Sequence, residues 1–314
     1  MGNLNFEILI DETFANINTD ESLNPIANKK VLSLINDFED GSWRYTNFQR
    51  FIWDNIAETS LSYKERESLV GEPQTTLATA ARNLRLTDKE DGTSKDRDIS
   101  RGSELAEIVL YGLMKHHYGA LPVVPKIFYK QNPQDNAKGA DSVHIVIEGE
   151  NDFSIWFGEA KFYNSIENAR LDTIIESVEN SIKTDKLRKE NSIITNVSDI
   201  DYLITNEELR DKIKGFLSQK TSIDGLKSKL HIPILILHEC KKTKEATDLT
   251  QEYRDAIVAY HKDRAIAYFK KQLDKIKNTH RYSEITFHLI LFPVPCKKTI
   301  VDRFVANVEY QKNQ

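Results

Sequence analysis

The 314-residue sequence predicts an α/β protein in which a mixed central sheet is flanked by helices. Two segments, 231–240 and 284–294, are strongly apolar and β-branched, which is typical of strands buried on both faces. Two more strands are expected at 141–149 and 153–162, on either side of a turn-like Gly-Glu-Asn-Asp sequence. From residue 101 the expected order is helix, two strands, helix, a helical insertion, strand, helix, strand and helix.

The first 100 residues are expected to form a mainly helical lobe ahead of the sheet-forming domain at 101–314. The segment 87–100 separates the two, because it is polar, highly charged and without a hydrophobic period. The lobe carries 18 acidic and 11 basic residues, an excess that suits contact with a protein partner better than with nucleic acid. The elements expected in the lobe are a strand at 4–10 and helices at 28–39, 46–61 and 73–86.

The helices expected in the larger domain follow from apolar residues at helical spacing. The first of them has recognisable ends, since Ser103 is a good N-cap residue and Gly119 is typical of a helix C-terminus. The helices predicted after residue 101 lie at 102–119, 165–183, 246–278 and 299–311.

Composition excludes several classes of protein. The longest apolar stretches, 232–237 and 289–295, are far shorter than the roughly 18 residues that span a bilayer, so no membrane partner is expected. The two cysteines, Cys240 and Cys296, are isolated and encode neither a disulfide framework nor a zinc site. No secretory signal is visible, and we therefore expect a cytoplasmic protein.

The sequence Phe-Ser-Ile-Trp-Phe-Gly-Glu-Ala-Lys-Phe-Tyr at 153–163 carries the main functional signal. Side chains two residues apart share one face of a strand, so Glu159 and Lys161 project together at the end of an apolar run. Asp141 stands at the start of the preceding strand, directly after Gly139 and Ala140. If the two strands pair, two carboxylates and an ammonium group converge, and an ordinary salt bridge is the simplest alternative to an active site.

Two carboxylates at one point provide the hard oxygen ligands that Mg²⁺ prefers. A third carboxylate is expected from the helix at 102–119. At about 100° per residue, Glu104 borders the apolar face of this helix, whereas Glu107 points nearly opposite to it. Glu104 is therefore the expected third ligand, and both glutamates otherwise complement the positive end of the helix dipole.

The motif Gly139-Ala140-Asp141 followed by Glu159-Ala160-Lys161 resembles the core of PD-(D/E)xK nucleases, with Ala140 in place of the proline. More specifically, the segments Arg-Gly-Ser-Glu-Leu-Ala-Glu from 101, Lys-Gly-Ala-Asp-Ser-Val-His from 138 and Trp-Phe-Gly-Glu-Ala-Lys-Phe-Tyr from 156 resemble the HamA family. Its members are nuclease effectors of Hachiman anti-phage systems and act with a helicase, HamB.

This resemblance implies a DNase that depends on Mg²⁺ or Mn²⁺, has little sequence specificity and is controlled by a HamB-like helicase. Asp141, Glu159, the Ala160 carbonyl and Glu104 would hold the metal. Lys161 would orient the attacking water or neutralise charge at the phosphate. DNA would lie against basic residues of the last third of the chain, namely Lys241, Lys242, Lys244, Lys270, Lys271, Lys275 and Lys277.

Two alternatives stay open at this point. A chain with a nuclease fold can serve as a catalytically inactive subunit that binds DNA or a helicase. A nuclease of the same fold can also be a site-specific restriction or repair enzyme, which would cut at discrete positions.

Overall fold

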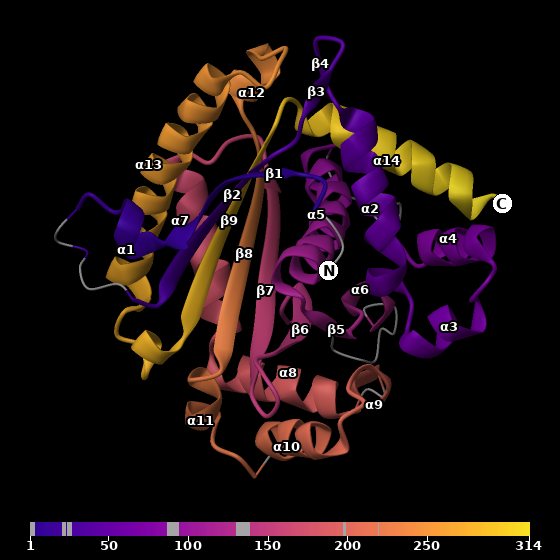
Figure 1. Cartoon of the computed structure of the whole chain (residues 1–314), viewed down its shortest axis with the longest axis vertical. Coiled ribbons are helices and arrows are strands. Elements are labelled where there is room, and N and C mark those ends of the chain that lie inside the picture. The colour runs from indigo at the N-terminus through magenta and orange to yellow at the C-terminus, as the bar shows by residue number, and fades with distance from the viewer. Residues whose placement is uncertain are drawn as a thin grey trace.

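A seven-stranded mixed sheet forms the centre of the molecule, in the order β1-β2-β9-β8-β7-β6-β5 (Figure 1). The computed structural model describes residues 4–20, 23, 27–86, 94–129, 139–196, 199–218 and 220–314. Four adjacent strands, β2, β9, β8 and β7, run parallel, while β1, β6 and β5 pair antiparallel to their neighbours. The strands of this sheet are β1 (Glu7–Thr13), β2 (Lys29–Ile35), β5 (Leu121–Val124), β6 (Ser142–Ile147), β7 (Phe153–Tyr163), β8 (Leu230–Glu239) and β9 (Thr286–Val294).

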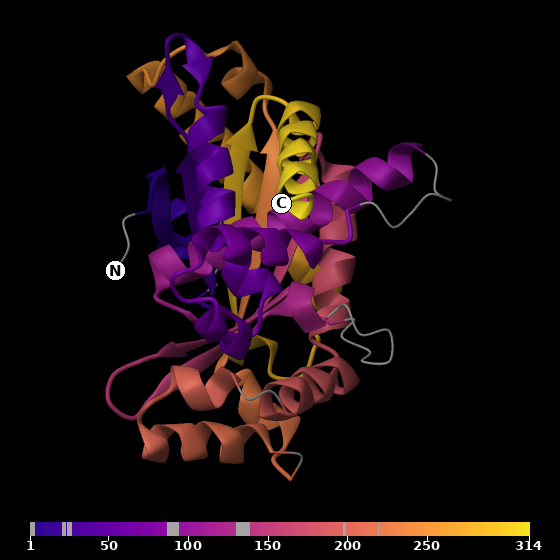
Figure 2. The same cartoon turned by 90° about the vertical axis from the view of Figure 1, so that its right-hand side faces the viewer.

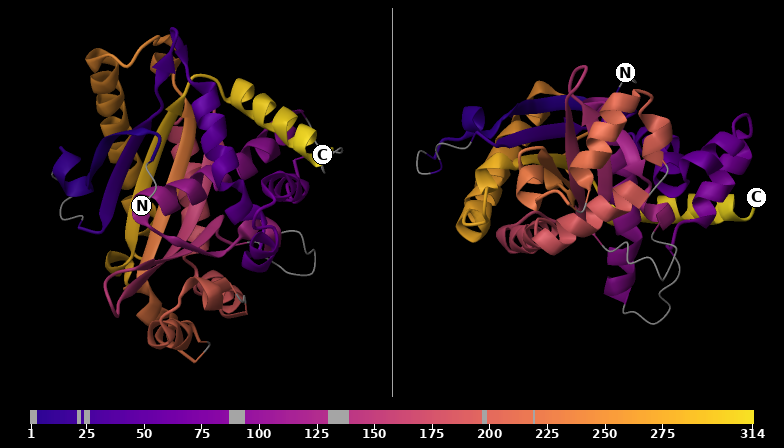
Figure 3. Two further views of the ribbon diagram at one scale, coloured as in Figure 1. Left: turned by 45° about the vertical axis from the view of Figure 1, so that its right-hand side comes forward. Right: turned by 90° about the horizontal axis from the view of Figure 1, so that it is seen from below.

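Helices cover both faces of the sheet, which confirms the predicted α/β class (Figures 1 and 3). The longer helices are α2 (Tyr45–Ser60), α4 (Pro73–Arg82), α5 (Ser94–Tyr118), α7 (Asn168–Ser181), α8 (Thr184–Asn196), α10 (Glu207–Leu217), α13 (Gln251–Ile276) and α14 (Lys297–Lys312). The short ones are α1 (Phe14–Ile17), α3 (Tyr63–Ser68), α6 (Lys126–Tyr129), α9 (Asp199–Leu203), α11 (Ile223–Lys227), α12 (Lys241–Glu245) and a 3₁₀ turn at Tyr282–Glu284. Two short strands, β3 (Phe38–Glu39) and β4 (Ser42–Trp43), form a separate hairpin.

Alternation along the strands divides the core into two layers. In β8, Ile232, Ile234 and Ile236 pack with α7, α8 and α13 on one face, whereas Leu235 and Leu237 pack with α2, α5 and α14 on the other. Both faces are apolar because both are covered, as expected for parallel inner strands. Helices α8 to α11, which follow α7 in the chain, gather at one end of the sheet (Figures 1 and 2). Among the described residues, no helix is long and apolar enough to cross a membrane.

Close packing of α5 on the sheet depends on Gly158 in β7. A Cβ atom at this position would lie 2.2 Å from Ser142 Oγ and 2.8 Å from Leu110 Cδ2. Any larger residue would push α5 and β6 away from the strand that carries Glu159 and Lys161. The glycine of the motif therefore allows the helix and both strands to meet at the point where the polar residues follow.

Two predictions about the N-terminal region are wrong. The segment predicted as a helix at 28–39 contains β2, which pairs with β1 and β9 in the central sheet. Its run Val-Leu-Ser-Leu-Ile is buried almost throughout, and a short continuous apolar run does not distinguish a strand from a helix. In the segment 87–100, residues 87–93 lie outside the described part, but α5 already begins at Ser94, so the predicted loop is too long.

The first 100 residues contribute to the sheet as well as to the helices around it. β1 and β2 form one side of the sheet, and α2 packs on α5. The strand predicted at 4–10 and the helices predicted at 46–61 and 73–86 are confirmed by β1, α2 and α4.

Candidate active site

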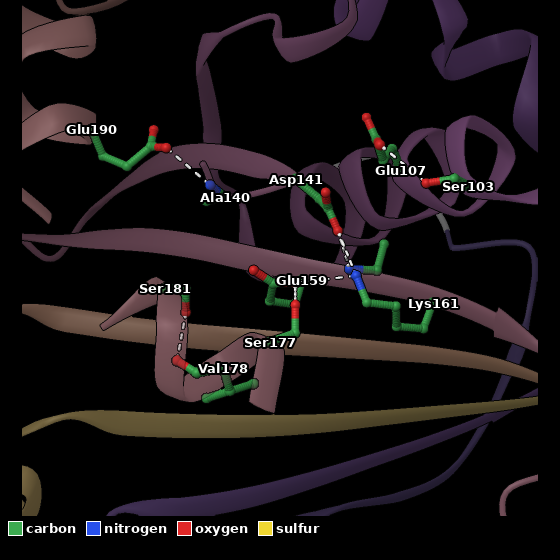
Figure 4. A network of polar contacts seen from close by, with 11 residues as sticks. Ser103, Glu107, Ala140, Asp141, Glu159, Lys161, Ser177, Val178, Ser181 and Glu190 are labelled. Atoms are coloured by element: carbon green, nitrogen blue, oxygen red, sulfur yellow. Dashed lines mark hydrogen bonds and ion pairs between the residues drawn. The ribbon is translucent and has the colours of Figure 1, made fainter. Parts of the chain in front are cut away.

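Pairing of β6 with β7 brings the three motif residues to one place. Ser142 lies opposite Gly158, and the Asp141 amide donates a hydrogen bond of 2.8 Å to the Gly158 carbonyl. Continuing the antiparallel register by one residue places Asp141 opposite Glu159. Glu159 and Lys161 share a face of β7, so all three side chains project to the same side of the sheet (Figure 4).

The Lys161 ammonium group lies between the two carboxylates. Its Nζ is 3.2 Å from Asp141 Oδ2 and 3.2 Å from Glu159 Oε2. The Ala160 amide also donates to Asp141 Oδ2 at 3.0 Å, and Ser177 Oγ of α7 donates to Glu159 Oε2 at 2.6 Å. We call Asp141, Glu159 and Lys161 the carboxylate–lysine cluster. Each of its carboxylates is thus oriented by a neutral donor as well as by the shared ammonium group.

Burial and like charge change the protonation behaviour of this cluster. The Glu159 side chain is 6% exposed, and its burial, together with the nearby Asp141 carboxylate, raises the pKa of Glu159. For Lys161, burial lowers the pKa, but the Asp141 and Glu159 carboxylates outweigh it and raise the pKa above its usual range. The Lys161 ammonium group therefore lies within ion-pair distance of two carboxylates, and carboxylate oxygens are also the ligands that a divalent cation prefers.

A pocket opens beside the cluster, with a volume of about 330 Å³. Asp141 and Glu159 line it, as do Lys186 and Glu190 of α8. The remaining lining residues are Gly139, Ala140, Ser177, Asn180 and Ser181. Small and polar side chains of α7 and α8 thus keep the two carboxylates accessible from outside the core.

The helical-wheel prediction for the two glutamates of α5 is wrong. Glu107, predicted to point away from the apolar face, is 2% exposed and lies 3.5 Å from Ser103 Oγ (Figure 4). Glu104 accepts hydrogen bonds of 3.1 Å from the Arg85 amide through both carboxylate oxygens and is not part of the described pocket lining. The wheel assumed one buried face, whereas α5 is covered by α2, α14 and β7 together.

The predicted DNA-binding lysines are not among the described residues that line the pocket, although α13 packs on α7, which contributes to the lining. Three of them on α13 face acidic side chains: Lys270 lies 3.3 Å from Asp20, Lys271 2.8 Å from Asp172 and Lys275 3.0 Å from Glu176. Lys241, Lys242 and Lys244 belong to α12, and Lys277 follows α13. Among the described residues that line the pocket, the lysine is Lys186, which was not one of the predicted DNA-binding residues.

The residues at the pocket suit a divalent metal ion. Asp141 and Glu159 supply carboxylate oxygens, and the Ala160 carbonyl leaves the same edge of β7 as its amide, which faces Asp141. Among the described residues, no group of three His, Cys, Asp or Glu side chains is close enough to hold a metal. A site with two carboxylates, one carbonyl and several waters is the arrangement that Mg²⁺ commonly accepts.

Sequence reasoning missed Ser177 and Glu190, which both line the pocket. Ser177 had a detectable signal, because Ser177, Asn180 and Ser181 lie three and four residues apart and so share one side of the predicted helix. Glu190 had none, since it lies in the predicted helical insertion, within which no individual helix was placed.

Comparison with known proteins gives one family. The family model named HamA matches residues 11–308 of the 314. No curated protein matches the sequence. The family match spans every strand of the sheet except the start of β1, and it includes the carboxylate–lysine cluster.

Proposed function

We propose that this chain, which belongs to the HamA family and is thereby associated with Hachiman anti-phage defence, is a metal-dependent DNase with little sequence specificity. The observation that supports this proposal is the meeting of Asp141, Glu159 and Lys161 beside an open pocket. Two carboxylates that share one ammonium group are poorly explained as a stabilising salt bridge, because their mutual repulsion adds to the cost of burial.

In the proposed mechanism, the protein groups hold and orient the reacting atoms. Asp141, Glu159 and the Ala160 carbonyl would bind Mg²⁺ or Mn²⁺, which lowers the pKa of a bound water and polarises the scissile phosphate. Lys161 would turn its ammonium group toward the phosphate and stabilise the negative charge that develops there. The Ala160 amide and Ser177 hydroxyl would keep both carboxylates in place when Lys161 moves. Glu104 has no part in this scheme, because its carboxylate binds the Arg85 amide.

DNA would bind along the rim of the pocket through its phosphates. Lys186 lines the pocket, and its side chain is 44% exposed. Lys186 lies 4.0 Å from Asp185, whereas the lysines of α13 face acidic side chains at 2.8–3.3 Å, so we expect them to add less affinity than Lys186. Phosphate contacts carry no sequence information, in agreement with low specificity. We also propose that a HamB-like helicase binds the chain in the cytoplasm and controls its access to DNA.

A plasmid-nicking assay tests this function. Supercoiled DNA is incubated with Mg²⁺ and the wild-type chain, both alone and together with the proposed helicase partner. Glu159→Gln and Lys161→Met are compared with Lys298→Met, which replaces an exposed lysine of α14. We expect nicking that stops with EDTA and with the first two variants but persists in the third, and a smear of products from linear DNA. Nicking that is indifferent to EDTA and to both cluster variants, or discrete product bands, would contradict the proposal.

A further inference from the structure

A second ion pair lies next to the pocket, and it is completely buried. Glu190 of α8 and Lys126 of α6 are 2% and 0% exposed, and Glu190 Oε2 lies 2.6 Å from Lys126 Nζ. The other oxygen, Oε1, accepts a hydrogen bond of 2.9 Å from the Ala140 amide. Both oxygens of Glu190 are therefore engaged, and one of them binds the amide of Ala140, the residue directly before Asp141 (Figure 4).

Gly139 makes this contact possible. A Cβ atom at residue 139 would lie 1.6 Å from Glu190 Oε1 and 2.8 Å from its carboxylate carbon. No side chain can therefore stand at this position while Glu190 binds the Ala140 amide. The Gly-Ala-Asp sequence of the motif thus provides both the carboxylate of Asp141 and the space for a second carboxylate behind it.

Stability alone is a poor explanation for the pair. Removing two charges from water costs several kcal/mol per ion, and well-packed apolar side chains of similar volume often stabilise a protein as much or more. The position of the Lys126–Glu190 pair suits a different role, which is to hold the backbone next to Asp141. The Asp141 amide binds the Gly158 carbonyl on β7, and Glu190 holds the preceding amide from α8. Together these two contacts fix the Asp141 backbone from opposite sides.

Lys126, which binds Glu190, is itself held in place by the neighbouring elements. The Lys126 amide donates to Tyr111 Oη at 3.1 Å, and the Tyr111 hydroxyl donates to the Val124 carbonyl. Tyr111 is 2% exposed and belongs to α5, so Lys126 is tied to the helix that packs on β7. The network therefore links α5, α6 and α8 to the start of β6.

We propose that Glu190, held by Lys126, is a positioning residue that orients Asp141 for metal binding through its hydrogen bond to the Ala140 amide. This inference rests on the proposed function, since it assumes that Asp141 is a metal ligand. Residues that orient ligands in this way commonly change metal affinity by about 10- to 100-fold when they are replaced.

Two double variants isolate the hydrogen bond from the charges. Lys126→Met with Glu190→Gln removes both charges but keeps an amide oxygen that can accept from Ala140. Lys126→Met with Glu190→Met removes the same charges and the acceptor, with a side chain of similar length. Mn²⁺ affinity of the full-length chain is measured by isothermal titration calorimetry, with Asp141→Asn as the control for site-specific binding and thermal unfolding as the control for folding.

We expect the Gln variant to bind Mn²⁺ within about 3-fold of wild type and the Met variant to bind about 10- to 100-fold more weakly, with similar unfolding temperatures for the two. Equal Mn²⁺ affinity of the two folded variants would overturn the positioning role and leave the proposed nuclease intact. Wild-type Mn²⁺ binding that Asp141→Asn does not weaken would overturn the metal site itself, and with it both proposals. If the Met variant does not fold, Gly139→Ala displaces the Glu190 carboxylate with both charges present, and unchanged affinity there would equally overturn the positioning role.

Discussion

The carboxylate–lysine cluster and a second group of polar side chains both interrupt the apolar sheet, but the cluster lines an open pocket whereas the second group is fully buried. The second group, which we call the histidine chain, consists of Ser33 of β2, His261 of α13 and His238 of β8. Ser33 Oγ lies 2.7 Å from His261 Nδ1, and His261 Nε2 lies 3.1 Å from His238 Nε2. All three residues are 0% exposed, whereas the Lys161 side chain is 26% exposed.

The histidine chain and the carboxylate–lysine cluster also differ in charge. Burial lowers the pKa of His238 to about 4 and the pKa of His261 well below its usual value, so both rings are neutral at pH 7. Their nitrogen atoms are paired within the protein, with His238 Nδ1 lying 3.2 Å from the Glu239 carbonyl. The cluster instead combines two carboxylates and an ammonium group beside an open pocket. A buried polar group that is neutral and paired serves the fold, while one that is charged and accessible is suited to bind a ligand.

The largest expected effect is on DNA cleavage. We expect Lys161→Met to lower the nicking rate by at least about 100-fold, because a cation aimed at the reacting phosphate is lost. His261→Gln should leave the rate within about 3-fold, since the histidine chain has no access to the pocket. Parallel time courses of plasmid nicking measure both. A comparable loss in His261→Gln would remove the distinction between the two groups.

The free energy of unfolding should respond in the opposite order, with a larger loss from a change in the histidine chain than from a change in the cluster. His261→Leu leaves Ser33 and His238 without their partner and should lower the free energy of unfolding by about 2–3 kcal/mol. Glu159→Gln removes a charge that faces Asp141 and should leave the free energy of unfolding unchanged or raise it by about 1 kcal/mol. Urea denaturation of the two variants measures both changes. A more severe loss of stability in Glu159→Gln would mean that the cluster is built for the fold.

The histidine chain also predicts a dependence of stability on pH. The pKa of His238 falls from about 6.5 in the unfolded chain to about 4 in the folded protein. Between these values the unfolded state takes up a proton and the folded state does not, so stability is complete above pH 6.5 and declines as the pH falls toward 4. Each such histidine contributes a loss of about 1.4 kcal/mol per pH unit. Urea denaturation at pH 7.5 and 5.5 should show this loss, and His238→Gln should reduce its slope.

The smallest expected effect concerns the rim of the pocket. Lys186→Ala should weaken DNA binding several-fold and reduce by about one the slope of log affinity against log salt concentration. Lys271→Ala, which removes a lysine that already faces Asp172, should change that slope less. Fluorescence anisotropy over a series of salt concentrations measures both variants. Equal changes of the slope in Lys186→Ala and Lys271→Ala would indicate that DNA also contacts α13, as the sequence predicted.

The sequence predicted those parts of the site that depend on local geometry. Alternation along one strand was enough to place Glu159 beside Lys161, and the pairing of consecutive strands placed Asp141 opposite them. The prediction that Glu107 points away from the buried face of α5 and Glu104 borders it was wrong. It depended on how many sides of α5 are covered by other elements. Glu190 could not be predicted for a similar reason, since its contact with Ala140 joins residues 50 positions apart.

The prediction of the fold from the sequence was limited in the same way. Strands β6 to β9 were predicted because their apolar, β-branched runs are bounded by turn residues. β2 was not, because its short apolar run fits a strand or a helix and is fixed as a strand by its partners β1 and β9. Local patterns thus identify elements with strong periodicity, and tertiary contacts decide the rest.

The central claim is that Asp141 and Glu159 together bind a divalent ion, with Lys161 giving up its place between them. Crystals soaked in Mn²⁺ test this claim most directly through the anomalous scattering of the metal. We predict an anomalous peak within about 2.1–2.3 Å of carboxylate oxygens of both Asp141 and Glu159, with the Lys161 ammonium group moved away from them. A peak elsewhere in the molecule, or well-ordered crystals at saturating Mn²⁺ in which Lys161 still bridges the two carboxylates, would contradict it.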